Sequence, residues 1–264
     1  MRIARASLGA LSIVAIGGCT DLSTDSSQVR YGVLSVTAEP ATTGGGFVTN
    51  PIGLFYLDRA GALPDSKSQQ DNCAGQAFST AAPPPRQVQF IDAGATITFT
   101  TGGNTQQMNP VSGGTRYVLP QSVAFVPGAL VSFQIPGAEG GFPASTVNTN
   151  TPPPITFQQV LPEPPAGSGL ALSWNAGDDS SRVEVALRYA ASPSTDANQQ
   201  IYCQLRDDGT HSIPDDLLTG WRNANNDVRE AAANRFRTHT NVDGDVALLV
   251  YSVSQTSIPL APLP

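Results

Sequence analysis

The sequence is poor in the residues that most often carry out catalysis and in those that bind nucleic acids. Two histidines occur, His211 and His239, and neither belongs to an HExxH or His-x-His pattern that would hold a metal. No G-x-S-x-G sequence marks a nucleophilic serine. Lysine and arginine number 14 against 21 acidic residues, so the net charge is −7 and no basic stripe fits a phosphate backbone. We expect no catalytic residue, no metal, no cofactor and no nucleic-acid partner.

Long hydrophobic runs are also missing. The apolar stretch near the start, Leu8–Ile16, is much shorter than the roughly 20 apolar residues that span a bilayer. Arg2 and Arg5 precede it, and small residues follow it. A basic start, a short apolar core and small residues after it are typical of a secretory signal peptide, which we predict for residues 1–18.

The residues before Cys19 form the most specific motif of the chain. Ile16-Gly17-Gly18-Cys19 has an aliphatic residue and two small ones before a cysteine, and it resembles the lipobox of bacterial lipoproteins. The resemblance implies cleavage before Cys19, a diacylglyceryl group on its thiol and acylation of the new amine, with fatty acids such as palmitate. Two or more acyl chains hold a protein stably at a membrane. The alternative is an ordinary signal peptide with a chance cysteine.

The residue after Cys19 bears on the destination of the protein. In lipoproteins, an aspartate directly after the lipidated cysteine usually retains the protein at the inner membrane, whereas here Thr20 stands at that position and Asp21 follows it. The resemblance therefore implies the outer membrane of a Gram-negative cell envelope. Residues 19–30 are expected to form a flexible polar tether. Because no basic patch is present to dock on anionic lipid, the acyl chains would provide the attachment.

Cysteine is scarce, at three residues in 264. With Cys19 lipidated, Cys73 and Cys203 remain, and secretion places them in an oxidising compartment. We predict a disulfide between these two residues, which would join the two halves of the chain. The alternative is two separate buried thiols, because Cys203 lies in the apolar segment IYCQL.

Turn residues are abundant, and helical patterns are few. The chain contains 25 glycines and 22 prolines, and short runs rich in Val, Thr, Phe and Tyr alternate apolar with polar residues. This composition predicts an all-β protein. Two short helical segments are expected at 214–221 and 226–235, an irregular loop at 60–86 and hairpins at 87–101 and 235–255. The other expected strands are 31–38, 52–58, 115–119, 130–135, 155–160, 169–175, 181–190, 200–205 and 211–214.

The proline-rich segment LPEPPAGSG, residues 161–169, predicts a boundary near residue 164. We expect an N-terminal β domain at 31–163 and a C-terminal β-sandwich at 164–264. In the second of these, LALSW, VEVALRY and IYCQLRDDG resemble strands of immunoglobulin or fibronectin type III modules on bacterial surfaces. The resemblance implies a sandwich of about seven strands, but fold does not carry function.

Three groups of residues could form a binding site. The first is a set of aspartates beside turns, which could hold calcium or serve only turn geometry. The second is a pair of aromatic residues after glycine, Phe142 and Trp221, which could stack on a sugar or belong to the core. The third is the loop at 60–86, because loops of this length are often functional. The acidic members of the first group are Asp207, Asp208, Asp215, Asp216, Asp243 and Asp245, and those of the third are Asp65 and Asp71.

The sequence therefore predicts a lipid-anchored envelope protein with a non-catalytic structural or protein-interaction role. Its partners would be the membrane, through the lipid anchor, and an envelope protein. The alternative is a surface protein that binds a carbohydrate or another small ligand.

Overall fold

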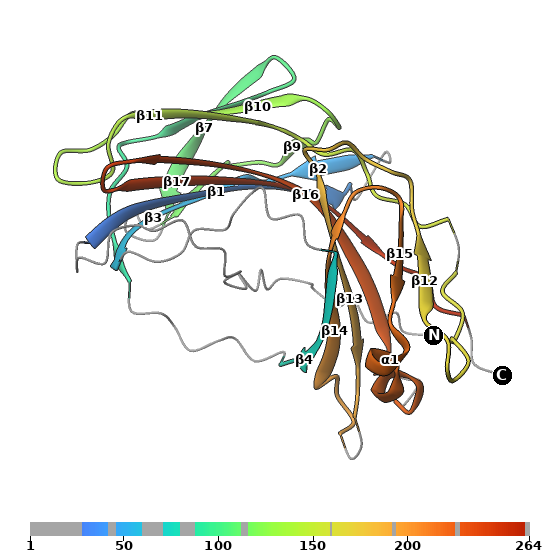
Figure 1. Cartoon of the computed structure of the whole chain (residues 1–264). Coiled ribbons are helices and arrows are strands. Elements are labelled where there is room, and N and C mark those ends of the chain that lie inside the picture. Colours follow the sequence, from blue (N-terminus) through green and yellow to red (C-terminus); the bar gives the residue numbers. More distant parts are fainter. Residues whose placement is uncertain are drawn as a thin grey trace.

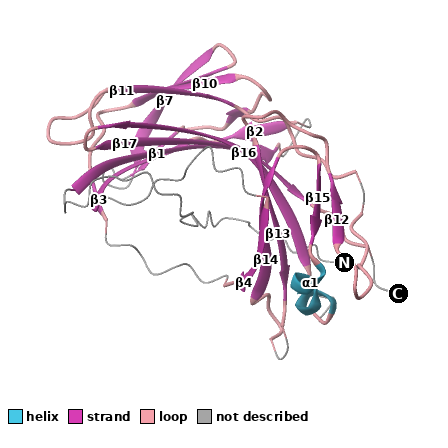
Figure 2. Ribbon diagram, in the orientation of Figure 1, coloured by secondary structure: helices cyan, strands magenta, loops and turns pink. Residues whose placement is uncertain are grey.

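The computed structural model describes residues 28–41, 46–59, 71–79, 88–111, 116–158, 160–191, 194–224 and 228–261. The predicted signal peptide, Cys19 and residues 19–27 of the predicted tether lie outside these ranges. Within them the protein is all-β with one short helix, as the composition predicts (Figures 1 and 2). The residues 28–30, placed in the tether from the sequence, form the start of the first strand.

The elements are β1 (Gln28–Pro40), β2 (Phe47–Thr49), β3 (Ile52–Arg59), β4 (Asn72–Ala77), β5 (Gln89–Phe90), β6 (Ile97–Thr101), β7 (Asn104–Val111), β8 (Arg116–Val118), β9 (Val123–Ala124), β10 (Leu130–Ile135), β11 (Ser145–Asn150), β12 (Leu170–Ser173), β13 (Arg182–Tyr189), β14 (Gln199–Arg206), β15 (Thr210–Ile213), α1 (Asp215–Arg222), β16 (Glu230–Asp243) and β17 (Val246–Ser257).

The main sheet is continuous and bends twice. Its strand order is β11-β10-β6-β7-β8-β3-β1-β17-β16-β13-β14-β4, and β12 pairs with β15 in a separate small sheet. In the first lobe, β11, β10 and β7 lie over β3, β1 and β17 (Figure 1). In the second lobe, β12, β15 and α1 lie over β13, β14 and β16 (Figure 1). Each lobe is therefore a β-sandwich with its own core.

The two cores follow from alternation along the strands. In β13, Val183, Val185, Leu187 and Tyr189 are all buried, and the residues between them are half-buried. The first core contains Leu34, Phe55, Phe99, Tyr117, Phe133, Phe142, Leu248 and Val250 among others. The second contains Leu172, Trp174, Val185, Ile201, Cys203, Leu218 and Trp221 among others.

The hairpin of β16 and β17 joins the lobes. Its strands pair from Asp243↔Val246 to Ala232↔Ser257, and Gly244 at the turn has φ +57°, a left-handed conformation that glycine adopts without strain. This confirms the predicted hairpin at 235–255. Residues 230–236 of β16 pair with β13, whereas residues 246–254 of β17 pair in parallel with β1. Strand β4 comes from the first half of the chain but joins the sheet of the second lobe, where it pairs with β14.

The predicted boundary near residue 164 stays a prediction, and so does the immunoglobulin-like character of residues 164–264. The structure adds that strands from each side of residue 164 complete the lobe on the other side. The end of the chain supplies Leu248 and Val250 to the first core, and the first half of the chain supplies Cys73 to the second.

Four local predictions are wrong. Residues 60–86 are not wholly irregular, because β4 lies among them; residues 60–70 and 80–86 lie outside the described ranges. Residues 87–101 do not form a hairpin, since β5 pairs with β3 and β6 pairs with β7 and β10. The described residues of 155–160 form an isolated bridge, Phe157↔Trp174, in place of a strand. Most of the helix expected at 226–235 is the start of β16, because pairing on both sides outweighs the helix propensity of its alanines.

The turn at residues 92–94 is held by a buried tyrosine from β8. The Tyr117 hydroxyl lies 2.9 Å from Asp92 Oδ1 and 2.8 Å from the Gly94 carbonyl, and it accepts a hydrogen bond from the Ala93 N–H. The Gly94 N–H donates to Asp92 Oδ1 at 2.8 Å. This hydrogen bond and that of the tyrosine lower the pKa of the Asp92 carboxyl. The turn is therefore attached to the first core.

Candidate functional site

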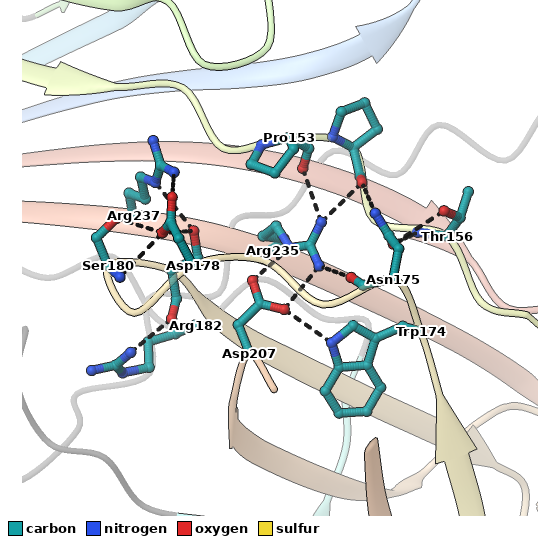
Figure 3. Close-up of polar contacts among 12 residues, drawn as sticks. Pro153, Thr156, Trp174, Asn175, Asp178, Ser180, Arg182, Asp207, Arg235 and Arg237 are labelled. Carbon is teal, nitrogen blue, oxygen red and sulfur yellow. Dashed lines mark hydrogen bonds and ion pairs between the residues drawn. The ribbon is translucent and has the colours of Figure 1, made fainter. Parts of the chain in front are cut away.

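A buried polar network is centred on Arg235 of β16. Ala231, Ala233 and Arg235 share the face of β16 that is turned to the second core, and Arg235 is completely buried. Its Nε lies 2.7 Å from Asp207 Oδ2, and its Nη2 donates to Oδ1 at 2.8 Å. Trp174 Nε1 donates to the same Oδ1 at 3.0 Å. A bidentate ion pair with both partners buried is held by geometry as well as by charge (Figure 3).

Arg235 also binds the chain segment that leads from the first lobe into the second. Its Nη1 donates to the carbonyls of Pro154 at 2.9 Å and Pro153 at 3.4 Å, and its Nη2 donates to the Asn175 carbonyl. The Asn175 side chain donates to the Pro154 carbonyl at 3.0 Å and accepts from the Thr156 N–H at 2.7 Å (Figure 3). Proline has no N–H to join a sheet, so these side chains replace a ladder.

Two residues further along β16, Arg237 repeats this arrangement. It donates to Ser181 Oγ at 3.1 Å and to the Thr151 carbonyl at 3.2 Å, and it forms an ion pair with Asp178. Burial raises the pKa of Asp178, but hydrogen bonds from Ser180 and Ser181 and the charge of Arg237 outweigh it, so the net pKa is lowered. We call Trp174, Asn175, Asp178, Asp207, Arg235 and Arg237 the arginine junction.

The arginine junction is suited to attaching the segment between the lobes to the second lobe rather than to chemistry. Both oxygens of Asp207 already face Arg235, and neither side chain of the pair is exposed. A substrate therefore has no route to the carboxylate in this arrangement. The sequence interpretation assigned Asp207 to a turn and missed this role. The available signal was an arginine that continues the alternation of Ala231 and Ala233 toward a core.

No family model and no curated protein matches this chain. The function must therefore be argued from its own residues. None of the helices in the described ranges is long and apolar enough to cross a membrane.

The predicted disulfide is present. Cys73 of β4 and Cys203 of β14 lie directly opposite each other, with their Cα atoms 4.0 Å apart and their sulfurs bonded. His211 Nε2 lies 3.5 Å from Cys73 Sγ. Asp71 pairs with Arg206 at 2.5 Å; burial opposes the ionisation of Asp71, but the bonds to Arg206 prevail and lower its pKa, with a smaller effect of His211. The disulfide and this ion pair attach β4 to the second lobe.

The remaining acidic residues are dispersed. Asp215 pairs with Arg222, Asp245 pairs with Arg30, and Asp208 accepts from the Thr210 N–H at 3.3 Å within its turn. The described residues contain no group of three or more His, Cys, Asp or Glu side chains placed to hold a metal. Asp216 and Asp243 are exposed, as is His239, and Asp65 lies outside the described ranges. The predicted set of aspartates is therefore not brought together in one place.

Both aromatic candidates for sugar stacking belong to the cores. Phe142 is completely buried and packs against Phe55, and Trp221 is 3% exposed and packs edge-on to Tyr189. Neither ring could stack on a ligand without opening a core. Of the two interpretations offered by the sequence, the assignment of both residues to the cores is correct.

Sequence reasoning also missed a group of polar and aromatic side chains on the face of the main sheet opposite the two cores, where Tyr56 and Tyr251 pack against a third buried cluster. There Glu184 lies directly across from Asn234 on β16 and Gln204 on β14. Burial raises the pKa of the Glu184 carboxyl, and hydrogen bonds from Tyr202 and Asn234 oppose this in part. Burial also raises the pKa of Tyr251 to about 12, with further contributions from Tyr56 and Glu184. Hydrogen-bonding groups and aromatic rings are therefore adjacent on this face.

Proposed function

We propose that the chain is a lipid-anchored protein of the bacterial cell envelope with a non-catalytic structural or protein-interaction role. The observation that carries the proposal is the sequence Ile16-Gly17-Gly18-Cys19 after a basic start and a short apolar core. The location that fits this motif best is the outer membrane, since Thr20 rather than aspartate follows the cysteine.

The use of polar residues in the fold supports a non-catalytic role. Among the described residues, the most deeply buried ion pair is that of Asp207 with Arg235, and Arg235 is also occupied by the carbonyls of Pro153 and Pro154. The aspartates of the described turns are bound to arginines or to backbone groups of their own turns or lie exposed. A disulfide and a rigid two-lobed scaffold suit a protein that presents surfaces outside the cytoplasm.

The anchor is tested by replacing Cys19 with serine. The parent chain should fractionate with membranes, and mass spectrometry should find acyl groups on its N-terminal cysteine. The Cys19→Ser chain should leave the membrane fraction. The double variant Cys73→Ser with Cys203→Ser is the control, since it also loses thiols but keeps the lipobox and should stay in the membrane. If Cys19→Ser remains with membranes and the parent carries no acyl mass, the proposal is wrong.

The sorting rule gives a second test of the same proposal. Thr20→Asp places an acidic residue directly after the lipidated cysteine, and the protein should move from the outer to the inner membrane in a density gradient. Thr20→Ser is the control and should leave the distribution unchanged. An unchanged distribution of Thr20→Asp would remove the support for the outer membrane but not for the anchor.

A second candidate function is the binding of a carbohydrate or another small ligand beside Glu184, on the face of the main sheet opposite the second core. The observation in its favour is the adjacency of Glu184, Tyr202 and Asn234, because a ligand with several hydroxyls needs both donors and acceptors. Binding would be sought on a glycan array and by thermal shift. Glu184→Gln should abolish any signal, and Glu39→Gln, at an exposed position of β1, should retain it.

A further inference from the structure

Strand β4 ends the sheet of the second lobe. Within the described ranges it pairs only with β14, and Figure 1 shows it at the outer edge of the sheet. The residue after β4 shows which backbone groups of the strand bond to β14. The N–H of Phe78 donates to the Asn198 carbonyl at 2.9 Å, in the same register. Alternate residues of antiparallel strands bond to the same neighbour. The N–H and C=O groups of Cys73, Gly75 and Ala77 therefore point away from β14.

Among the described residues, this edge lacks the usual protection against pairing. Sheet edges are generally protected by charges, proline, a bulge or a covering segment. The sequence of β4, NCAGQA, has no charge and no proline, and its register with β14 runs without a bulge from Asn72 to Ala77. Asn72, Ala74, Gly75 and Ala77 are exposed. The edge can accept another strand.

The edge is also fixed in place before any partner arrives. The disulfide from Cys73 to Cys203 attaches it covalently, and the Asp71–Arg206 ion pair holds its beginning. A partner strand would therefore not have to order β4, which lowers the entropic cost of binding.

We propose that β4 pairs with β4 of a second copy of this chain, in an antiparallel arrangement with Gly75 opposite Gly75. The outward groups of Cys73, Gly75 and Ala77 are symmetric about Gly75, so each N–H meets a C=O of the other copy. No like charges face each other in this pairing, because β4 carries none. This deepens the proposed interaction role and rests on it, since it names a second copy as the partner.

The contact is small, because a single pair of six-residue strands buries less than the roughly 1,200 Å² of a stable interface. The dimer is therefore weak in solution and is favoured where copies are concentrated, as they would be on a membrane. Association should accordingly increase with protein concentration.

Gly75 provides a matched pair of variants. Gly75→Pro removes an outward N–H without removing a bond to β14, and edge positions of this kind tolerate proline. Gly75→Ala keeps the N–H, and a Cβ at this position meets no atom within 4 Å. The full chain in detergent is examined by sedimentation velocity over a range of concentrations. We expect the parent and Gly75→Ala to dimerise alike, and Gly75→Pro to dimerise about tenfold more weakly or not at all.

The disulfide, verified by mass, and the circular dichroism spectrum show whether each variant is folded. A parent chain that is monomeric at every concentration overturns the inference, as does a folded Gly75→Pro chain that dimerises as well as Gly75→Ala. A photo-crosslinker at Gln76 gives a second readout, which should join two copies through residues 72–77; a crosslink only to another protein overturns it. The Cys19→Ser chain should dimerise in the same way. The experiment therefore distinguishes a failure of the lipid-anchor proposal from a failure of the β4 pairing proposal.

Discussion

Replacing Asp207 with asparagine perturbs the arginine junction most directly. The substitution preserves the size of the side chain and a carbonyl oxygen for Trp174, but it removes the charge that neutralises Arg235. Because both side chains of the pair are 0% exposed, the guanidinium would stay buried without a counter-ion. Removing one partner of a buried ion pair costs about 3–5 kcal/mol.

For a chain of this size, each kcal/mol lowers Tm by about 2–4 °C, so Asp207→Asn should lower it by about 6–20 °C. Scanning calorimetry of the disulfide-bonded protein at neutral pH measures the change. Asp208→Asn is the matched control, because the Asp208 side chain is 50% exposed and lies 4.0 Å from its partner Arg206. Its effect should stay within about 0.5 kcal/mol.

A double variant separates the charge from the packing. Asp207→Leu combined with Arg235→Met removes both charges and leaves apolar groups in their place, so it should destabilise less than Asp207→Leu alone. The reasoning would be refuted by either of two results. One is an Asp207→Asn effect no larger than that of Asp208→Asn, and the other is a double variant whose loss equals the sum of the single losses.

Three further predictions concern other parts of the fold. A Cβ at Gly177 would lie 1.9 Å from Asp207 Oδ2, so Gly177→Ala should lower the stability by about 1–3 kcal/mol in urea unfolding; an unchanged midpoint would contradict this clash. Replacing Cys73 and Cys203 together by serine should cost about 2–5 kcal/mol, because the disulfide closes a loop across 130 residues of sequence; equal Tm values with and without it would count against this. The lowered pKa of Asp92 stabilises the fold above the ordinary carboxyl pKa, and this contribution is lost as the pH falls through the native value, so Asp92→Asn should flatten the dependence of Tm on pH below about pH 5.

Strands whose residues alternate between a core face and the opposite face could be predicted from the sequence. The alternation in VEVALRY is strict, and the segment forms β13 with its apolar residues in the second core. The two-residue turn at Gly244 and the helix after Pro214 were likewise predictable, because local chemistry specifies them. The disulfide followed from cysteine number and compartment rather than from geometry.

The elements that were missed depend on distant partners. NCAGQA has neither β propensity nor alternation, and β14 together with the disulfide makes it a strand. Residues 230–235 favour a helix locally but lie between β13 and β17 in the sheet. The role of Asp207 depends on an arginine 28 residues later in the chain, and no local pattern contains that pairing.

The parallel pairing of β1 with β17 has a kinetic consequence. Arg30 and Asp245, which meet at one end of this pair, are separated by 215 residues of sequence. Contacts at such separation form slowly, because the chain loses the entropy of closing a long loop before the stabilising contacts form. β1 can pair early with β3, but it cannot meet its other neighbour, β17, until nearly the whole chain is available. The first lobe is therefore completed only after β17, the last strand of the described chain, has emerged.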